Sequence, residues 1–402
     1  MLILNIIKKY SLKAQGLNKT IKDHSILSTI KIRGNLQSLF NVKTISTQKE
    51  PPWNVLFFGT DDFALQSLRK LYYKYGARKL LSRLEVVTAY DGKENAVTKF
   101  ARQHEIPIHN WPPKIDFTQF HIGLVVSFGH LIPSHMILSF PLGMLNVHGS
   151  LLPRWRGAAP IIYTLMNGDS ETGVTIMKVM PKKFDIGEIV AQRKINVHPD
   201  EMMPELRDRM SRLGADLLLD TVEKLPEILE TAVPQGDHGV TYAPKVNSKL
   251  SLVKWDEMTA KNVYDLYRAL YELYPLATKF MGSIVKLLDI QVLKEPPPGR
   301  HSSKKIAVVY CRENSWISVS KIGYPGRPLM SARDFNNGFI SKNRKKESFF
   351  VIDFIVTQEL LKTENITYCE MVIPFSWSIF RRILILDDLG TFFFFSFLFL
   401  RL

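Results

Sequence analysis

Residues 144–157 read Met-Leu-Asn-Val-His-Gly-Ser-Leu-Leu-Pro-Arg-Trp-Arg-Gly, which is a short apolar run that leads into a polar loop. On an extended strand, Asn146 and His148 point to one side and Val147 to the other, because successive side chains alternate. An Asn amide can donate a hydrogen bond to an oxyanion, and a His can exchange protons at neutral pH. The stretch therefore predicts a buried strand that carries a site for acyl transfer.

Apolar runs of similar length recur on both sides of this strand and alternate with helical patterns. This alternation is typical of an α/β fold, and we predict a Rossmann-like parallel sheet with helices on both faces. The run Gly-Thr-Asp-Asp-Phe-Ala at 59–64 is not a GxGxxG motif, so we infer no dinucleotide. The strands are predicted at 54–58, 85–89, 122–128, 144–150, 173–180 and 188–197, and the helices from Asp61 and at 96–104 and 204–224.

Asp185 stands in Phe-Asp-Ile-Gly after the apolar run 173–180, and we expect that run to deliver it to the end of a strand. A carboxylate beside an imidazole favours the charged form of the ring and fixes its orientation. Asp185 is therefore the predicted partner of His148. On these residues alone, a turn aspartate and a buried, backbone-bonded Asn and His are equally reasonable.

The sequence NVHGSLLPRWRGAAPI at 146–161 closely resembles the signature of the folate-dependent formyltransferases. Its ending, RWRGAAPI, resembles the branch of that family that formylates methionyl-tRNA. The resemblance implies formyl transfer from the co-substrate 10-formyltetrahydrofolate to the amino group of initiator methionyl-tRNA, without a covalent enzyme intermediate. It also implies catalytic roles for Asn146, His148 and Asp185.

Two other functions stay open on the sequence. A formyltransferase that acts on a small amine, such as a sugar or purine precursor, is disfavoured by the lack of a sugar-nucleotide or dehydrogenase segment and by the basic C-terminal half. A noncatalytic RNA-binding protein on the same scaffold is disfavoured because a retired site has no chemical reason to keep Asn146, His148 and Asp185.

Two segments resemble the parts of the family that line the folate site, namely 128–133 and 150–153. Pro153 fixes its own backbone angle and favours an extended Leu152, which can present apolar side chains and backbone groups to a flat ring. An ordinary strand-to-helix loop is the alternative. The predicted folate contacts are Phe128, Gly129, Leu131, Ile132, Pro133, Ser150, Leu151, Leu152 and Pro153.

The net charge of +15 is unevenly distributed along the chain. Residues 51–244 are neutral, with 21 basic and 21 acidic residues, whereas residues 245–347 hold nineteen basic and nine acidic residues, a net +10. A neutral catalytic half next to a basic half suits a small-molecule site coupled to RNA binding, although a solvated basic surface is the alternative. The predicted tRNA contacts are Arg154, Arg156, Lys304, Lys305 and Arg312.

The ends and junctions complete the predicted organisation. Residues 1–50 carry nine basic and two acidic residues and no long apolar run, which indicates a mitochondrial presequence and a matrix enzyme. We expect the catalytic domain at 51–232 and a linker at 233–248. Short strand-like runs suggest a small β-barrel domain at 249–347, and the resemblance implies that this domain is OB-like and binds tRNA. TYAPKV at 241–246 resembles the interdomain junction of the family. The tail 348–402 no longer resembles the family and is expected to be disordered.

Composition narrows the remaining properties. The chain has two cysteines, Cys311 and Cys369, and no CxxC motif, so the sequence predicts neither a disulfide framework nor a metal site. The apolar run near the C-terminus is too short to span a bilayer, which needs roughly 20 residues. We therefore expect no membrane anchor. The protein is also expected to be a monomer. Residues 90–98 are short and hold one lysine, where bacterial members of the family carry a basic inserted loop.

Substitution of Lys304, Lys305 and Arg312 by glutamate should weaken tRNA binding. Each phosphate contact made on binding releases counterions from the RNA, and the variant makes fewer of these contacts. The expected result is a lower affinity and a shallower dependence of log K on log salt concentration, measured by filter binding. An unchanged salt slope would place the RNA elsewhere on the protein.

Overall fold

A computed structural model describes residues 50–90, 92–295, 307–340, 383–386 and 392–395. The predicted presequence, apart from Glu50, and most of the predicted tail lie outside these residues. The architecture below concerns these described residues.

Within the described residues, the N-terminal half is built on a seven-stranded sheet with the strand order β3-β2-β1-β4-β5-β6-β7. The first five strands are parallel to their neighbours, which confirms the α/β prediction. The strands are β1 (Trp53–Phe58), β2 (Leu81–Thr88), β3 (Ile108–Asn110), β4 (Ile122–Val126), β5 (Met144–His148), β6 (Glu171–Lys178) and β7 (Ile189–Asn196).

The last two strands correct the prediction of a parallel sheet. β6 runs antiparallel to β5, and β7 antiparallel to β6, so the sheet is mixed. β6 and β7 are joined by a short connection, whereas a parallel pair needs a crossover of a dozen or more residues. Apolar patterning reveals burial but not strand direction, which is why the sequence did not show the reversal.

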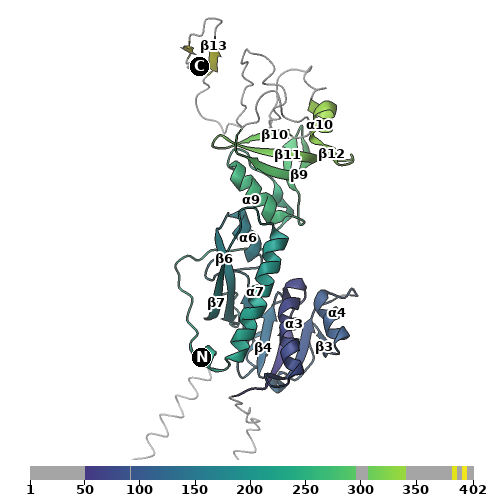
Figure 1. Cartoon of the computed structure of the whole chain (residues 1–402), viewed down its shortest axis with the longest axis vertical. Helices are drawn as coiled ribbons and strands as arrows, with labels where there is room; N and C mark the ends of the chain where they lie inside the picture. The colour runs from purple at the N-terminus through teal and green to yellow at the C-terminus, as the bar shows by residue number, and fades with distance from the viewer. Residues whose placement is uncertain (1–49, 91, 296–306, 341–382, 387–391, 396–402) are drawn as a thin grey trace, which may run out of the picture. The chain divides into compact units, whose positions relative to one another are not determined.

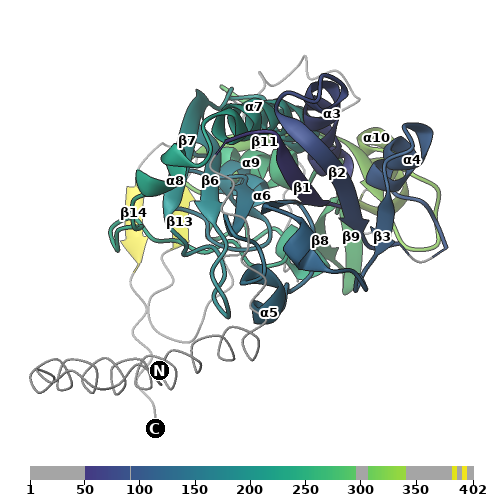
Figure 2. The same cartoon turned by 90° about the horizontal axis from the view of Figure 1, so that it is seen from below.

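The two faces of the sheet are covered differently (Figures 1 and 2). Val55 and Phe57 of β1 point into the core formed with α3, α4 and α7, whereas Leu56 and Phe58 point into a core closed by α5 and loops. Asp61 caps α3 by accepting from the Ala64 backbone N–H, as expected for a helix that begins after a tight turn. The helices are α3 (Asp62–Gly76), α4 (Ala96–Gln103), α5 (Ser134–Ile137), α6 (Pro160–Met166), α7 (Met203–Glu223) and α8 (Glu227–Glu230), with a short η2 (Phe117–Gln119).

The C-terminal half has its own core around an antiparallel sheet with the order β10-β11-β9-β8, and β12 pairs with β11. This confirms a second domain of antiparallel strands, whereas closure into a barrel stays a prediction. Cys311 is buried there, and the burial raises the pKa of its thiol to about 12. The elements are η3 (Ser248–Ser251), α9 (Ala260–Leu270), β8 (Leu276–Phe280), β9 (Ser283–Leu293), β10 (Ala307–Cys311), β11 (Ser315–Gly323), β12 (Met330–Ser331), α10 (Ala332–Phe335), η4 (Asn336–Ile340), β13 (Ile383–Leu386) and β14 (Phe392–Phe395).

A buried ion pair lies within α9, and its arginine also contacts the loop before α7. The Nε of Arg268 donates to Oδ1 of Asp265 at 2.8 Å, and both side chains are only 3% exposed. Nη1 of Arg268 also donates to the backbone carbonyl of Glu201 at 3.3 Å.

Among the helices of the described ranges, none is long and apolar enough to cross a membrane.

Asp265→Ala should lower the free energy of unfolding by about 3–5 kcal/mol, because it leaves the buried guanidinium of Arg268 without its charge partner. Asp208→Ala is the matched control, since its ion pair with Arg212 on α7 is half exposed and should contribute about 0.5 kcal/mol or less. Denaturant unfolding measures the free energy of unfolding of both variants. Equal losses of stability in the two variants would show that the buried ion pair contributes no more than the exposed one.

Candidate functional site

The predicted strand β5 places its two polar side chains on one face of the sheet. Val147 is buried in the core on the α7 side, whereas Met144 packs into the opposite core, so Asn146 and His148 share the face of Met144. The side-chain amide of Asn146 is partly exposed and makes no hydrogen bond to any described residue. It is therefore free to donate to an oxygen atom of a bound molecule.

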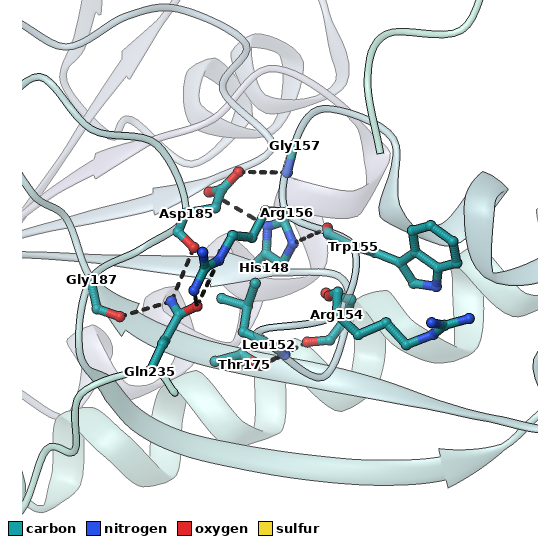
Figure 3. A network of polar contacts seen from close by, with 11 residues as sticks. His148, Leu152, Arg154, Trp155, Arg156, Gly157, Thr175, Asp185, Gly187 and Gln235 are labelled. Carbon is teal, nitrogen blue, oxygen red and sulfur yellow. Dashed lines mark hydrogen bonds and ion pairs between the residues drawn. The ribbon is translucent and has the colours of Figure 1, made fainter. Parts of the chain in front are cut away.

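The two ring nitrogens of His148 face different groups (Figure 3). Nε2 lies 2.9 Å from the backbone carbonyl oxygen of Trp155, and because a carbonyl only accepts, Nε2 carries a hydrogen in this contact. Nδ1 lies 3.7 Å from Oδ1 of Asp185, which is longer than a hydrogen bond. Nδ1 is thus the nitrogen left to exchange a proton, and the predicted proximity of His148 and Asp185 is observed.

Asp185 reaches His148 by a longer route than the sequence suggested. β6 ends at Lys178, which pairs with Leu145 at the start of β5, so the end of β6 lies away from His148. The following loop returns along the sheet face, where Oδ2 of Asp185 accepts from the Gly157 N–H at 2.9 Å. Asp185 has a left-handed φ of 51°, a strained geometry that non-glycine residues keep only where their surroundings hold them.

The loop after β5 is held by side chains from the antiparallel strands. Oγ1 of Thr175 donates to the Ser150 carbonyl at 2.7 Å and accepts from the Leu152 N–H at 3.1 Å. Gln192 on β7 donates to the Leu152 carbonyl at 2.9 Å. These contacts fix the segment that the sequence assigned to folate binding, and neither Thr175 nor Gln192 was predicted.

Residues of the predicted linker complete the site. Oε1 of Gln235 accepts from Nε and Nη2 of Arg156 at 3.0 and 2.8 Å, and its Nε2 donates to the carbonyls of Asp185 and Gly187 at 3.0 and 2.9 Å (Figure 3). Thr241 accepts from the Trp155 N–H through its hydroxyl at 2.9 Å. A Gly- and Pro-rich stretch without periodicity carries no signal that would have identified either residue.

The predicted folate contacts divide into buried and accessible groups. Phe128 is 3% exposed and packs edge-on against Phe58 and Trp111, so it anchors the segment 128–133 in the core. Leu131, in contrast, is 63% exposed. Ile132, Ser150 and Leu152 are buried as well, whereas Gly129, Pro133, Leu151 and Pro153 keep accessible surface. Contact of these residues with folate stays a prediction.

The two arginines of the signature are engaged within the protein. Arg154 forms a two-pronged ion pair with Asp169 at 2.8 and 2.5 Å, which raises the pKa of the guanidinium, and stacks over the Trp155 ring at 4.2 Å. Arg156 is held by Gln235. Arg312 is exposed on the C-terminal domain, while Lys304 and Lys305 lie outside the described residues.

No group of three or more His, Cys, Asp or Glu side chains is placed to hold a metal ion in the part of the chain that the structure describes. The arrangement offers an amide donor and an imidazole backed by a carboxylate, which suits proton transfer and stabilisation of an oxyanion.

Comparison with known proteins identifies relatives over most of the chain. Residues 94–222 match the formyl transferase family, and residues 245–340 match the formyl transferase C-terminal domain. The mitochondrial methionyl-tRNA formyltransferase of Homo sapiens is 40% identical over 320 residues, which are 75% of this chain and 81% of that protein. The methionyl-tRNA formyltransferase of Lactiplantibacillus plantarum is 32% identical over 314 residues, 72% of this chain and 96% of that protein.

The fold is also found among solved structures. The N-formyltransferase from Helicobacter canadensis, solved in complex with folinic acid and dTDP-3-aminofucose, superposes with a TM-score of 0.51. It is 14% identical and covers 67% of this chain and 99% of its own. At this identity the similarity concerns the fold.

Gly157→Ala should lower the free energy of unfolding by about 1–3 kcal/mol, because Gly157 has a φ of 125° that a side chain disfavours. A Cβ at this position would also lie 2.6 Å from the Ala243 carbonyl oxygen. Gly236→Ala is the control, since a Cβ there meets no atom within 4 Å. Thermal unfolding measures both, and a Gly157→Ala protein as stable as the control would contradict the tight approach of residues 157 and 243.

Proposed function

The chain belongs to the methionyl-tRNA formyltransferase family, and on that basis we propose that it transfers a formyl group from 10-formyltetrahydrofolate to the amino group of initiator methionyl-tRNA. The mitochondrial relatives, together with the basic, acid-poor residues 1–50, support action in mitochondria, and we place the enzyme in the matrix. Its role there is to prepare the initiator tRNA for translation.

One observation carries the catalytic proposal. The unpartnered amide of Asn146 and Nδ1 of His148 lie on the same face of β5, with the Asp185 carboxylate beyond Nδ1. An amine can attack a formyl carbon that lies between these two groups. The formyl oxygen then faces the Asn146 amide, which donates, and the amine faces Nδ1 of His148, which acts as the base. Loss of one oxyanion donor typically raises the barrier by about 3–4 kcal/mol.

Proton transfer follows from the two contacts of His148. Because Nε2 already donates to the Trp155 carbonyl, Nδ1 takes the proton that the attacking amine releases. The resulting imidazolium has both N–H groups directed at acceptors, namely the Trp155 carbonyl and the Asp185 carboxylate. Nδ1 then returns the proton to the departing nitrogen as its bond to the formyl carbon breaks, so no net proton remains on the enzyme.

The folate site is assigned to the loops at 128–133 and 150–153, next to Asn146. Bound there, 10-formyltetrahydrofolate supplies the formyl carbon. The exposed Leu131 and the accessible Leu151 and Pro153 offer apolar surface to a flat ring, and Thr175 and Gln192 hold the second loop in place. The two loops therefore offer a preformed surface for the folate ring, and the side-chain amide of Asn146 beside them is a free hydrogen-bond donor.

The tRNA is assigned mainly to the basic C-terminal domain. Arg154 and Arg156 support the site through Asp169 and Gln235, so a phosphate contact by either would compete with its internal partner. Residues 245–347 supply the net +10 that a polyanionic substrate requires, and Arg312 is exposed within them.

The alternatives are less well supported. Relatives that are 40% identical over 320 residues bear the name methionyl-tRNA formyltransferase, whereas the N-formyltransferase complex with a sugar nucleotide is 14% identical. A noncatalytic RNA-binding protein would not need an unpartnered Asn146 amide beside a His–Asp pair.

His148→Ala should lower kcat for formylation of Met-tRNA by about 10²–10⁴-fold, because the base that accepts the proton is lost. The Kd for Met-tRNA, measured by filter binding, should stay nearly the same. His238→Ala is the control, since His238 is exposed and makes no hydrogen bond to a described residue. Normal turnover by His148→Ala would remove this residue from the mechanism.

A further inference from the structure

We propose that Gln235 is a positioning residue that sets the geometry of Asp185 for formyl transfer, an inference that rests on the proposed function. Gln235 belongs to the segment between the two domains, 50 residues beyond Asp185 in the chain. It touches none of the predicted catalytic side chains directly. Its effect is exerted through the backbone that carries the Asp185 carboxylate and through Arg156 next to Gly157.

The hydrogen-bonding capacity of the Gln235 amide is fully used (Figure 3). Its oxygen faces the guanidinium of Arg156, which only donates, and its nitrogen faces the carbonyls of Asp185 and Gly187, which only accept. The orientation of the amide is therefore fixed by chemistry. A carboxylate at this position would satisfy Arg156 with one oxygen but would place the other oxygen, which only accepts, against two carbonyl oxygens.

The two carbonyls that Gln235 holds belong to a strained segment. Asp185 keeps a left-handed φ of 51°, and Gly187 lies so close to β6 that a Cβ on it would overlap the Lys178 carbonyl oxygen. A backbone in this geometry persists only while neighbours hold it. With the Gln235 donors removed, we expect Asp185 to relax and its carboxylate to leave both the Gly157 N–H and Nδ1 of His148.

The segment that carries Gln235 is itself anchored on both sides. Val233 pairs with Ile189 at the start of β7, and Tyr242 pairs with Arg156 in a parallel bridge. Gln235 therefore sits on a fixed backbone between these two bridges. Gln235 contacts the loop after β5 through Arg156 and the loop after β6 through Asp185 and Gly187. It therefore fixes the positions of these two loops relative to each other.

The test uses the full-length protein with two substitutions of Gln235, one control substitution and an Asp185→Ala background. Gln235→Glu keeps the size and the Arg156 contact but replaces the donors, and Gln235→Met removes all hydrogen bonds without adding charge. Asp237→Asn is the matched control, because it makes the opposite exchange of carboxylate and amide at an exposed side chain two residues away. If Gln235→Glu does not fold, Gln235→Met decides the question.

Both Gln235 variants should lower kcat for Met-tRNA formylation by about 10²-fold, with KM for Met-tRNA close to wild type. In an Asp185→Ala background the same substitutions should have no further effect on kcat, because they act through that carboxylate. Hydrogen exchange at the Gly157 amide should accelerate in Gln235→Met, whether or not the protein is active.

Three results would overturn the positioning role. They are an unchanged kcat in both variants, a full additional loss in the Asp185→Ala background, and an unchanged exchange rate at Gly157. Failure of the wild-type and Asp237→Asn proteins to formylate Met-tRNA would instead contradict the proposed function, while the exchange rate at Gly157 would still report on the role of Gln235.

Discussion

The hydrogen bond from the Gly157 N–H to the Asp185 carboxylate, 2.9 Å long, joins the two loops from which the site is made. One loop follows β5 and belongs to the parallel half of the sheet. The other follows β6, which runs the opposite way and ends near the start of β5. Because the sheet reverses direction between these strands, the second loop must return along the sheet face before its carboxylate can approach His148.

This return explains several local features that would otherwise be unrelated. Asp185 and Gly157 both have positive φ values, and Gly187 passes β6 too closely for a side chain. Trp155, with a φ of 62°, turns its carbonyl toward Nε2 of His148. Three residues with positive φ thus lie where the segments of the site meet, and hydrogen bonds from residues distant in sequence hold them there.

The strand that carries the chemistry could be predicted because its alternation is a local property. Asn146 and His148 share a face and Val147 is buried, as the pattern required. The pairing of His148 with Asp185 was only one of two readings of the residues, because 37 residues separate the two and no spacing rule connects them, and the family resemblance favoured it. The resemblance also located the second domain, although β3 was missed because its three residues are too few for a pattern.

What the sequence could not show depends on direction and on single long-range contacts. Apolar runs do not reveal that β6 is antiparallel. The sequence therefore placed Asp185 at the end of a strand, whereas it lies on a loop that returns toward His148. The sequence also could not show that Asp169 and Gln235 bind Arg154 and Arg156, whose contact with tRNA stays a prediction. Gln235 and Thr241 stand in a Gly- and Pro-rich segment that reads as a spacer, and only the folded chain shows that they contact the site.

The central claim is that this chain formylates the amino group of methionyl-tRNA. The most direct test is transfer of radiolabelled formyl from 10-formyltetrahydrofolate by the purified wild-type protein to Met-tRNA, with uncharged tRNA and free methionine in parallel. The account predicts label on Met-tRNA alone. Label on free methionine, or none on Met-tRNA despite binding of that tRNA, would contradict it.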